Sequence, residues 1–145
     1  MNRIFGIIVI AVLLLGFAGC SGKAAAVPGN QNNDKASNKG GYSVMKQDVA
    51  KRNLQEDSSI TLVDVRTPEE YADLHIPGSV LMPLDTIKKE AEKKLDSKEA
   101  TIYVYCRSGN RSATATKILE ELGYTKVYNI GGITTWPYET EKGSK

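Results

Sequence analysis

Short apolar runs alternate with stretches of helical periodicity across residues 42–141, and this alternation predicts the fold. The apolar runs are rich in β-branched or aromatic residues and predict four strands, at residues 59–65, 80–82, 101–105 and 126–130. Between them, apolar side chains recur at helical spacing, as at Ile87, Ala91 and Leu95. Strands that alternate with helices in this way favour an α/β fold with a largely parallel sheet flanked by helices.

Residues that favour helix ends predict where the helices begin and stop. Thr67 followed by Pro68 is typical of an N-cap and a first helical position. Asp85 is expected to cap a later helix, and Gly123 to end the one after it. The expected helices are residues 46–55, residues 68–74, the helix that follows Asp85, the helix that stops at Gly123, and a short last helix that holds Trp136.

The chain begins with a stretch that is typical of a targeting segment. Arg3 precedes residues 4–18, which are almost wholly apolar but fewer than the roughly 20 that span a bilayer comfortably. The stretch ends in Leu-Gly-Phe-Ala-Gly before Cys20, which resembles the lipobox of bacterial lipoproteins. That resemblance implies that residues 1–19 are a cleaved signal peptide and that Cys20 is acylated. Two alternatives stay open: an ordinary signal peptidase that removes Cys20, or an uncleaved anchor.

The next segment has the composition of a linker. Residues 20–41 are rich in Gly, Ala, Asn and Lys and have no aromatic residue before Tyr42, so we expect a flexible tether. The folded domain is expected over residues 42–141, followed by a tail of residues 142–145. The expected location is outside the cytoplasm, where a lipid anchor holds the protein to a membrane and it faces the periplasm or the cell exterior. A soluble secreted or periplasmic protein is the alternative.

Charge and composition exclude several classes of partner. The formal net charge of +2 is too small to indicate nucleic acid, and no basic stripe interleaved with aromatic residues is present. The chain contains one His and two Cys, which do not make a metal-ligand set of the usual spacing. We therefore expect neither a metal nor a cofactor. If Cys20 is acylated, Cys106 has no partner for an intramolecular disulfide.

Cys106 is the candidate nucleophile, because it stands where a predicted strand turns into a predicted helix. The first N–H groups of a helix lack partners within the helix and attract negative charge, which lowers the pKa of a thiol placed there. Arg107 and Arg111 add positive charge, and Gly109 allows the backbone to curl closely around a bound group. The pattern therefore predicts an activated thiolate that faces an anion pocket.

Four stretches together resemble the single-domain rhodaneses, a family of sulfurtransferases. They are residues 62–71 (LVDVRTPEEY), 75–79 (HIPGS), 106–112 (CRSGNRS), and 129–132 (NIGG) with Trp136. The chain departs from the family at Leu74, where a Gly usually precedes the His. The resemblance implies a rhodanese-like α/β domain with a five-stranded parallel sheet between helices. It also implies that Cys106 accepts a sulfane sulfur as a persulfide.

The resemblance assigns roles to the residues that follow Cys106. The loop would bind the persulfide or an anionic donor through residues that are consecutive in the sequence: Arg107, Ser108, Gly109, Asn110 and Arg111. The implied partners are a small anionic sulfur donor such as thiosulfate or a persulfide, and an external thiol, cyanide or protein acceptor. The acceptor must be external because no second cysteine is available in the domain.

Two other functions stay open. Phosphatases and arsenate reductases separate their Cys and Arg by five residues so that the loop surrounds a tetrahedral oxyanion, whereas only four residues separate Cys106 from Arg111. The shorter loop favours transfer of a single sulfur atom. The other alternative is a non-catalytic binding module that retains the loop.

Three further polar residues have structural interpretations. Asp64 and Arg66 end a predicted strand and are expected to fix neighbouring loops, with a possible place in the pocket wall. His75 could act as a general base, but a thiolate that the helix already stabilises needs none. We therefore expect His75 to be structural.

Overall fold

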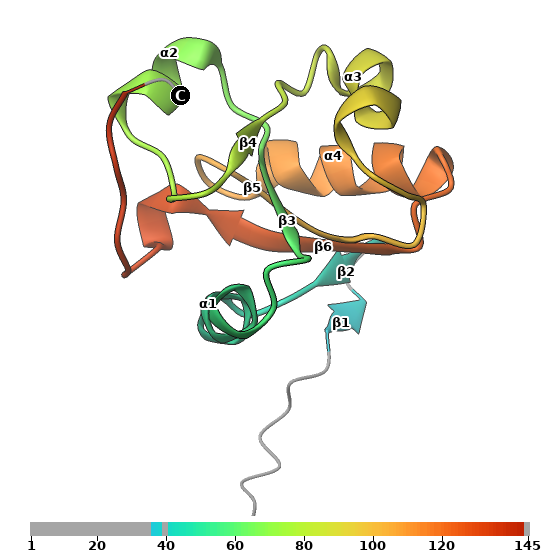
Figure 1. The fold of residues 1–145 in the computed structure, drawn as a ribbon, viewed down its shortest axis with the longest axis horizontal. Coiled ribbons are helices and arrows are strands. Elements are labelled where there is room, and N and C mark those ends of the chain that lie inside the picture. The colour runs from blue at the N-terminus through green and yellow to red at the C-terminus, as the bar shows by residue number, and fades with distance from the viewer. Residues whose placement is uncertain (1–35, 39–40, 144–145) are drawn as a thin grey trace, which may run out of the picture. The chain divides into compact units, whose positions relative to one another are not determined.

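The computed structural model describes residues 36–38 and 41–143 (Figure 1). The predicted signal peptide and the acylated Cys20 lie outside these residues, as does most of the predicted tether. Among the described residues, no helix is both long and apolar enough to cross a membrane.

A mostly parallel sheet forms the middle layer, which confirms the predicted α/β architecture. Its strand order is β1-β2-β6-β5-β3-β4, and every neighbouring pair is parallel except β1 and β2. The strands are β1 (Ser37–Asn38), β2 (Ser43–Val44), β3 (Thr61–Asp64), β4 (Val80–Leu81), β5 (Thr101–Cys106) and β6 (Lys126–Gly132). The four strands predicted from apolar runs are all present as β3, β4, β5 and β6.

The edge of the sheet next to β2 differs from the expectation. Strand β1 lies in the stretch expected to be a tether, and it adds a sixth, antiparallel strand to the five parallel ones. Both of its side chains are exposed, so backbone pairing of Ser37 with Val44 and of Asn38 with Ser43 forms it. Neither β1 nor β2 is long enough to show a two-residue hydrophobic period, and the apolar pattern therefore missed both.

Helices cover both faces of the sheet. They are α1 (Gln47–Glu56), α2 (Pro68–Asp73), α3 (Ile87–Lys94), α4 (Asn110–Glu121) and the 3₁₀ helix η1 (Ile133–Thr135). Figure 1 shows α1 on one side of the sheet and α3 and α4 on the other. The expected cap at Thr67 is present and reciprocal, since its hydroxyl accepts from the Glu70 amide and the Glu70 carboxylate accepts from the Thr67 amide.

The ends of three helices differ slightly from the predicted ends. Thr86, not Asp85, is the N-cap of α3, and its side chain makes no capping hydrogen bond. Leu74 caps α2 at a φ of −163°, an extended conformation that any residue adopts, so the glycine usual in the family is not needed here. Trp136 follows η1 and does not lie within it. Gly123 ends α4 as expected, with a positive φ of 91°.

Alternation along β5 divides its side chains between two hydrophobic cores. Ile102, Val104 and Cys106 belong to the core that includes the apolar residues of α3 and α4. Tyr103 and Tyr105 belong to the core on the α1 side. Because successive side chains of a strand point to opposite faces, the length of β5 places the thiol of Cys106 on the α4 side of the sheet. The carboxyl ends of β3, β4 and β6 lie at the same edge, where functional loops of parallel sheets gather.

Strand β6 ends in close contact with the loop that follows β5. A Cβ on Gly132 would lie 2.3 Å from the carbonyl oxygen of Arg107 and 2.5 Å from the Cα of Ser108. The backbone N–H and the hydroxyl of Thr134 both donate to the same Arg107 oxygen, at 3.2 and 2.9 Å. A glycine is therefore required at position 132 by space alone, since its φ of −125° suits any residue.

We expect Gly132→Ala to lower the free energy of unfolding by about 3 kcal/mol, since a backbone clash cannot be relieved by rotating a side chain. Gly78→Ala is the matched control. Its φ is 78° and no atom lies within 4 Å of the place that a Cβ would take, so it should cost about 1 kcal/mol from backbone strain alone. Urea unfolding measures both values. A Gly132→Ala protein no less stable than Gly78→Ala would contradict the close approach.

Candidate active site

Cys106 lies at the turn between β5 and α4, as the sequence predicted, and its thiol is buried. Cys106 is 1% exposed, and its Sγ accepts a hydrogen bond from the Gly109 N–H at 3.1 Å. The Ser112 hydroxyl lies 3.6 Å from the same sulfur. We call residues 106–112 the cysteine loop. Its donors converge on Sγ, the atom that would carry charge in a thiolate.

These contacts lower the pKa of the Cys106 thiol. Burial acts in the opposite direction, because a charged sulfur loses hydration, and it raises the pKa. Hydrogen bonds from the backbone and hydroxyl of Ser112 and from the backbone of Gly109 and Ser108 outweigh that effect. The net pKa lies below the usual value for a cysteine, so the loop stabilises the thiolate more than water does.

Gly109 gives the cysteine loop its curvature. It is the residue immediately before α4, and its φ of 103° lies in the region that side chains other than glycine rarely adopt. This conformation brings the Gly109 N–H back to the sulfur of the residue three positions earlier. The role predicted for Gly109 in the loop therefore has a geometric basis in its backbone.

Ser112 and Asn129 join the cysteine loop to β6. The Ser112 hydroxyl lies 2.7 Å from Asn129 Oδ1, 3.0 Å from the Gly109 carbonyl and 3.3 Å from the Gly131 carbonyl. A hydroxyl carries a single hydrogen, so these acceptors compete with the Cys106 sulfur for it. Asn129 Oδ1 also accepts from the Gly131 N–H at 2.8 Å, and its Nδ2 donates to the Gly109 carbonyl at 3.3 Å.

The sequence predicts no role for either Ser112 or Asn129. Both stand in stretches that resemble the family, residues 106–112 and 129–132, but the sequence alone does not bring the two stretches together. The parallel pairing of β5 with β6 does so, since Val104 lies opposite Asn129 and Cys106 opposite Gly132. That pairing places the Asn129 side chain next to the loop.

Arg111 forms a two-point ion pair with Glu70. Its two terminal nitrogens donate to the two carboxylate oxygens at 2.7 and 2.8 Å, and both side chains are about one-third exposed. Hydrogen bonding to Arg111 lowers the pKa of Glu70 to about 2. The sequence predicted anion binding for Arg111 and did not predict Glu70. The spacing of Thr67 and Glu70, which matches a capping box, was the available signal.

The other predicted loop residues contribute in different ways. The side chain of Arg107 is exposed and makes no hydrogen bond or ion pair within the part of the chain that the structure describes. Ser108 contributes its backbone to Cys106, as noted for the pKa of the thiol. Asn110 begins α4 and its carbonyl accepts from the Thr114 hydroxyl at 3.4 Å. Arg107 is thus the loop arginine whose charge stays available.

Asp64 and Arg66 are structural partners, as expected. Arg66 Nε lies 3.0 Å from both oxygens of Asp64, and Arg66 Nη2 lies 2.7 Å from Oδ2. Arg66 also donates to the Leu74 carbonyl at 2.5 Å, which ties β3 to the end of α2. Asp64 is fully buried, whereas Arg66 lines a neighbouring cavity. Of the two residues, Arg66 is the one with a place in a pocket wall.

His75 contacts the C-terminal segment and α2. Its ring stacks on Tyr71 with centroids 3.9 Å apart, and its nitrogens lie 2.9 Å from the Tyr71 carbonyl and 3.0 Å from the Glu141 carboxylate. Its backbone also pairs with that of Glu141. These contacts give it a structural function. Within the described residues, no group of three or more His, Cys, Asp or Glu could hold a metal ion.

Comparison of the chain with known protein families gives evidence that is independent of this geometry. The model of the rhodanese-like domain matches residues 46–138, which include the cysteine loop, Glu70 and Asn129. The chain belongs to the rhodanese-like family. This sulfurtransferase family shares the α/β fold described above, with its mostly parallel sheet between helices.

Two relatives show how far the similarity extends. The chain is 41% identical over 71 residues to the thiosulfate sulfurtransferase PspE of Escherichia coli, which is 49% of this chain and 68% of PspE. It is 38% identical over 92 residues to the putative sulfur carrier protein YrkF of Bacillus subtilis. That match covers 63% of this chain but only about half, 49%, of YrkF.

Solved structures give the same result for the fold. A rhodanese with anions from E. coli has a TM-score of 0.55 and 37% identity, and the match covers 58% of this chain and 99% of that one. A rhodanese-like protein from Staphylococcus aureus has a TM-score of 0.60 and 36% identity, covering 68% and 96%.

The cysteine loop yields a prediction for the thiol. We expect Ser112→Ala to raise the pKa of Cys106, because the variant removes a hydroxyl donor to the sulfur. Ser108→Ala is the matched control, since it keeps the backbone N–H and should leave the pKa unchanged. The pH dependence of alkylation by iodoacetamide measures this pKa. An equal pKa in the wild-type and Ser112→Ala proteins would show that the hydroxyl does not stabilise the thiolate.

Proposed function

We propose that the protein is a sulfurtransferase that carries a sulfane sulfur on Cys106. In the first step the Cys106 thiolate attacks the outer sulfur of thiosulfate. A bond forms between Sγ and that sulfur, the sulfur–sulfur bond of the donor breaks, and sulfite leaves with the bonding electron pair. The total charge is conserved, because a thiolate and thiosulfate become a persulfide anion and sulfite.

In the second step an external nucleophile removes the sulfur. A thiolate or cyanide attacks the outer sulfur of the persulfide, the bond to Sγ breaks, and its electron pair returns to Cys106 as the thiolate. No proton transfer from a side chain is needed when both nucleophiles are anions. This agrees with the structural contacts of His75, which are made to Tyr71 and Glu141.

The convergence of donors on the Cys106 sulfur is the observation that carries this proposal. Preorganised N–H groups stabilise charge where it develops, without reorganising during the reaction. The Gly109 N–H at 3.1 Å is already directed at Sγ. The relatives named as sulfurtransferases support the same chemistry.

The geometry favours sulfur transfer over the two alternatives. An oxyanion enzyme needs its loop arginine for the tetrahedral anion, but both terminal nitrogens of Arg111 are bound to Glu70. A pure binding module has no chemical need for a thiol whose pKa is lowered by its surroundings. We therefore favour a sulfurtransferase over an oxyanion enzyme and over a binding module.

The N-terminal pattern supports a proposal about location. We place the protein outside the cytoplasm, anchored through an acylated Cys20, on the lipobox-like sequence that precedes this residue. In that location an external thiol or protein would accept the sulfur. Metabolic labelling with a tagged fatty acid tests the anchor, and a Cys20→Ser protein that is labelled like the wild type would refute it.

Treatment with thiosulfate should add one sulfur to the protein and release one sulfite. The experiment uses the full-length chain with Cys20→Ser, so that Cys106 is the only cysteine present. Intact mass spectrometry detects the added sulfur, and cyanide should remove it as thiocyanate. Cys106→Ser in the same background is the control and should gain no mass. A protein with the native loop and a reduced Cys106 that neither gains sulfur nor releases sulfite would overturn the proposal.

A further inference from the structure

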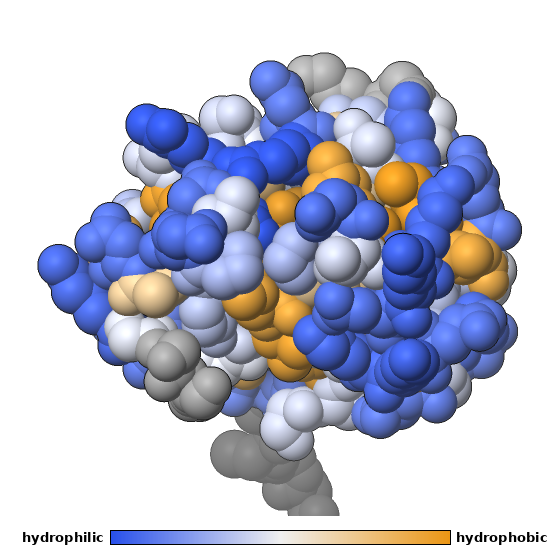
Figure 2. All heavy atoms as spheres, turned by 90° about the horizontal axis from the view of Figure 1, so that it is seen from above, coloured by the Kyte–Doolittle hydropathy of each residue, from blue (hydrophilic) through white to orange (hydrophobic). Residues whose placement is uncertain are grey.

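A buried hydroxyl beside the reactive thiol has more acceptors than hydrogens. Figure 2 shows hydrophilic side chains over much of one face, where water is available to them, but Ser112 is fully buried and Asn129 is only 5% exposed. Buried polar groups must find their partners within the protein. The Ser112 hydroxyl has one hydrogen to donate and lies near four acceptors, which are the Cys106 sulfur, Asn129 Oδ1 and the carbonyls of Gly109 and Gly131. Which acceptor takes that hydrogen decides how far Ser112 stabilises the thiolate.

The orientation of the Asn129 amide is fixed by two backbone groups. Its Oδ1 lies 2.8 Å from the nitrogen of Gly131, which can only donate, and its Nδ2 lies 3.3 Å from the carbonyl oxygen of Gly109, which can only accept. Turning the amide over would bring two donors together and two acceptors together. The oxygen is therefore the atom that faces the Ser112 hydroxyl, at 2.7 Å, and it can only accept from that hydroxyl.

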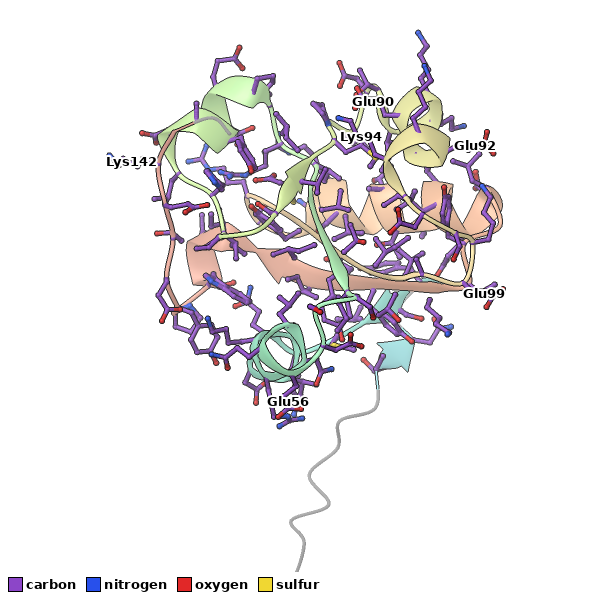
Figure 3. All side chains as sticks on the ribbon, in the orientation of Figure 1. Glu56, Glu90, Glu92, Lys94, Glu99 and Lys142 are labelled. Carbon is purple, nitrogen blue, oxygen red and sulfur yellow. The ribbon has the colours of Figure 1, made fainter. Side chains whose placement is uncertain are left out.

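The fold holds the hydroxyl and the amide in place. Asn129 lies in β6, where its carbonyl accepts from the Met45 N–H at 3.0 Å and its backbone pairs opposite Val104. Ser112 lies in the first turn of α4, and its carbonyl accepts from the Thr116 hydroxyl at 2.8 Å. Figure 3 shows that side chains fill the space between α4 and the sheet. The distances within this group are therefore set by the fold and stay nearly constant while the charge on the sulfur changes.

Cys106 is the titratable group that this hydroxyl and amide contact. The charged side chains nearby form two ion pairs, Arg111 with Glu70 and Arg66 with Asp64. Arg111 acts on the thiol through its charge. In the part of the chain that the structure describes, no charged side chain other than a Cys106 thiolate hydrogen bonds to the hydroxyl or to the amide. A change in their hydrogen bonding with pH therefore follows the ionisation of Cys106.

The charge on this sulfur changes during the proposed reaction. A neutral thiol is a weak acceptor, so the hydroxyl hydrogen should go to the amide oxygen at 2.7 Å. A thiolate carries charge, and hydrogen bonds to charged groups are about twice as strong, so the hydrogen should then turn to Sγ at 3.6 Å. In a persulfide the charge lies on the outer sulfur, about 2 Å farther along the sulfur–sulfur bond, and Sγ is again a weak acceptor.

We propose that Asn129 is a positioning residue that holds the Ser112 hydrogen while Sγ is uncharged and releases it when Cys106 becomes a thiolate. The persulfide part of this inference rests on the proposed sulfurtransferase function. Asn129 satisfies the buried hydroxyl in the thiol and in the persulfide, and it limits the stabilisation that Ser112 gives to the thiolate. A thiolate that is stabilised less is the stronger nucleophile toward a sulfur donor.

The amide proton of Gly131 detects the position of the hydrogen without altering the network. It donates to the same Asn129 oxygen, so its hydrogen bond should tighten when the Ser112 hydroxyl turns away. In ¹⁵N-labelled, full-length Cys20→Ser protein, we expect the Gly131 resonance to move downfield as Cys106 ionises, with the same midpoint as alkylation by iodoacetamide.

Ser112→Ala is the control for this titration. It keeps the electric field of the thiolate but removes the hydrogen, so the movement of the Gly131 resonance should fall to about half or less. A Gly131 resonance that does not move as Cys106 ionises, or that moves equally in the two proteins, would overturn the inference.

A double-mutant cycle separates this role from a merely structural one. Asn129→Leu removes the amide acceptor, so the Ser112 hydroxyl should donate to Sγ more often. The ionisation constant of Cys106, measured from the pH dependence of alkylation, should then rise about threefold, as expected for part of one hydrogen bond to a charged group. In the Ser112→Ala protein the same substitution should not raise it. Asn53→Leu removes an amide that donates to Tyr103 on the other face of the sheet and should leave the constant unchanged.

A structural role for Asn129 predicts the opposite sign. Loss of its bonds to the backbone of Gly109 and Gly131 would loosen the cysteine loop and lower the ionisation constant, with Ser112 present or absent. An Asn129→Leu protein that shows this behaviour, or the same change in both members of the cycle, would refute the positioning role.

Loading with thiosulfate extends the test to the persulfide. At a pH where the free thiol is ionised, the Gly131 resonance of the loaded protein should return to its position in the thiol form. A resonance that stays at the thiolate position would overturn the persulfide part of the inference. Failure of thiosulfate to load Cys106 would overturn the sulfurtransferase itself, whereas the titration and the cycle involve only the thiol and the thiolate and would still test Asn129.

Discussion

The hydrogen bonds that converge on the sulfur of Cys106 are the interaction on which the rest of the site depends. They require β5 to end with the thiol on the α4 side and Gly109 to adopt a positive φ. They also require β6 to approach so closely that position 132 has no room for a Cβ. The buried sulfur gains these donors in place of water, which is why burial does not prevent its ionisation. The requirements of the fold and the chemistry of the thiol thus concern the same turn, between β5 and α4.

The arginines near Cys106 contribute less directly to stabilising its thiolate than the sequence indicated. Two arginines follow Cys106 in the loop, but Arg111 is paired with Glu70 and the nearby Arg66 with Asp64. These pairs balance charge and fix the ends of α2 and β3, as in many partly buried arginine–carboxylate pairs. The thiolate therefore relies mainly on backbone N–H groups and the Ser112 hydroxyl.

Much of the fold and part of the site could be predicted from sequence, for identifiable physical reasons. Long apolar runs such as β5 and the cap at Thr67 leave strong local patterns, and the thiol at a strand–helix turn follows from them. Strand β1 leaves none, because backbone pairing alone forms it. Glu70 and Asn129 were missed because their partners lie 41 residues away at Arg111 and 17 at Ser112. Only the folded sheet and helices bring such pairs together.

The central claim is that the Gly109 N–H stabilises the Cys106 thiolate directly. The most direct test is a pH titration of the ¹⁵N-labelled protein, followed through the amide proton of Gly109. That resonance should move downfield as Cys106 ionises, with the same midpoint as alkylation, and should not move in Cys106→Ser. A Gly109 amide that is unaffected by the ionisation of Cys106 would contradict the account.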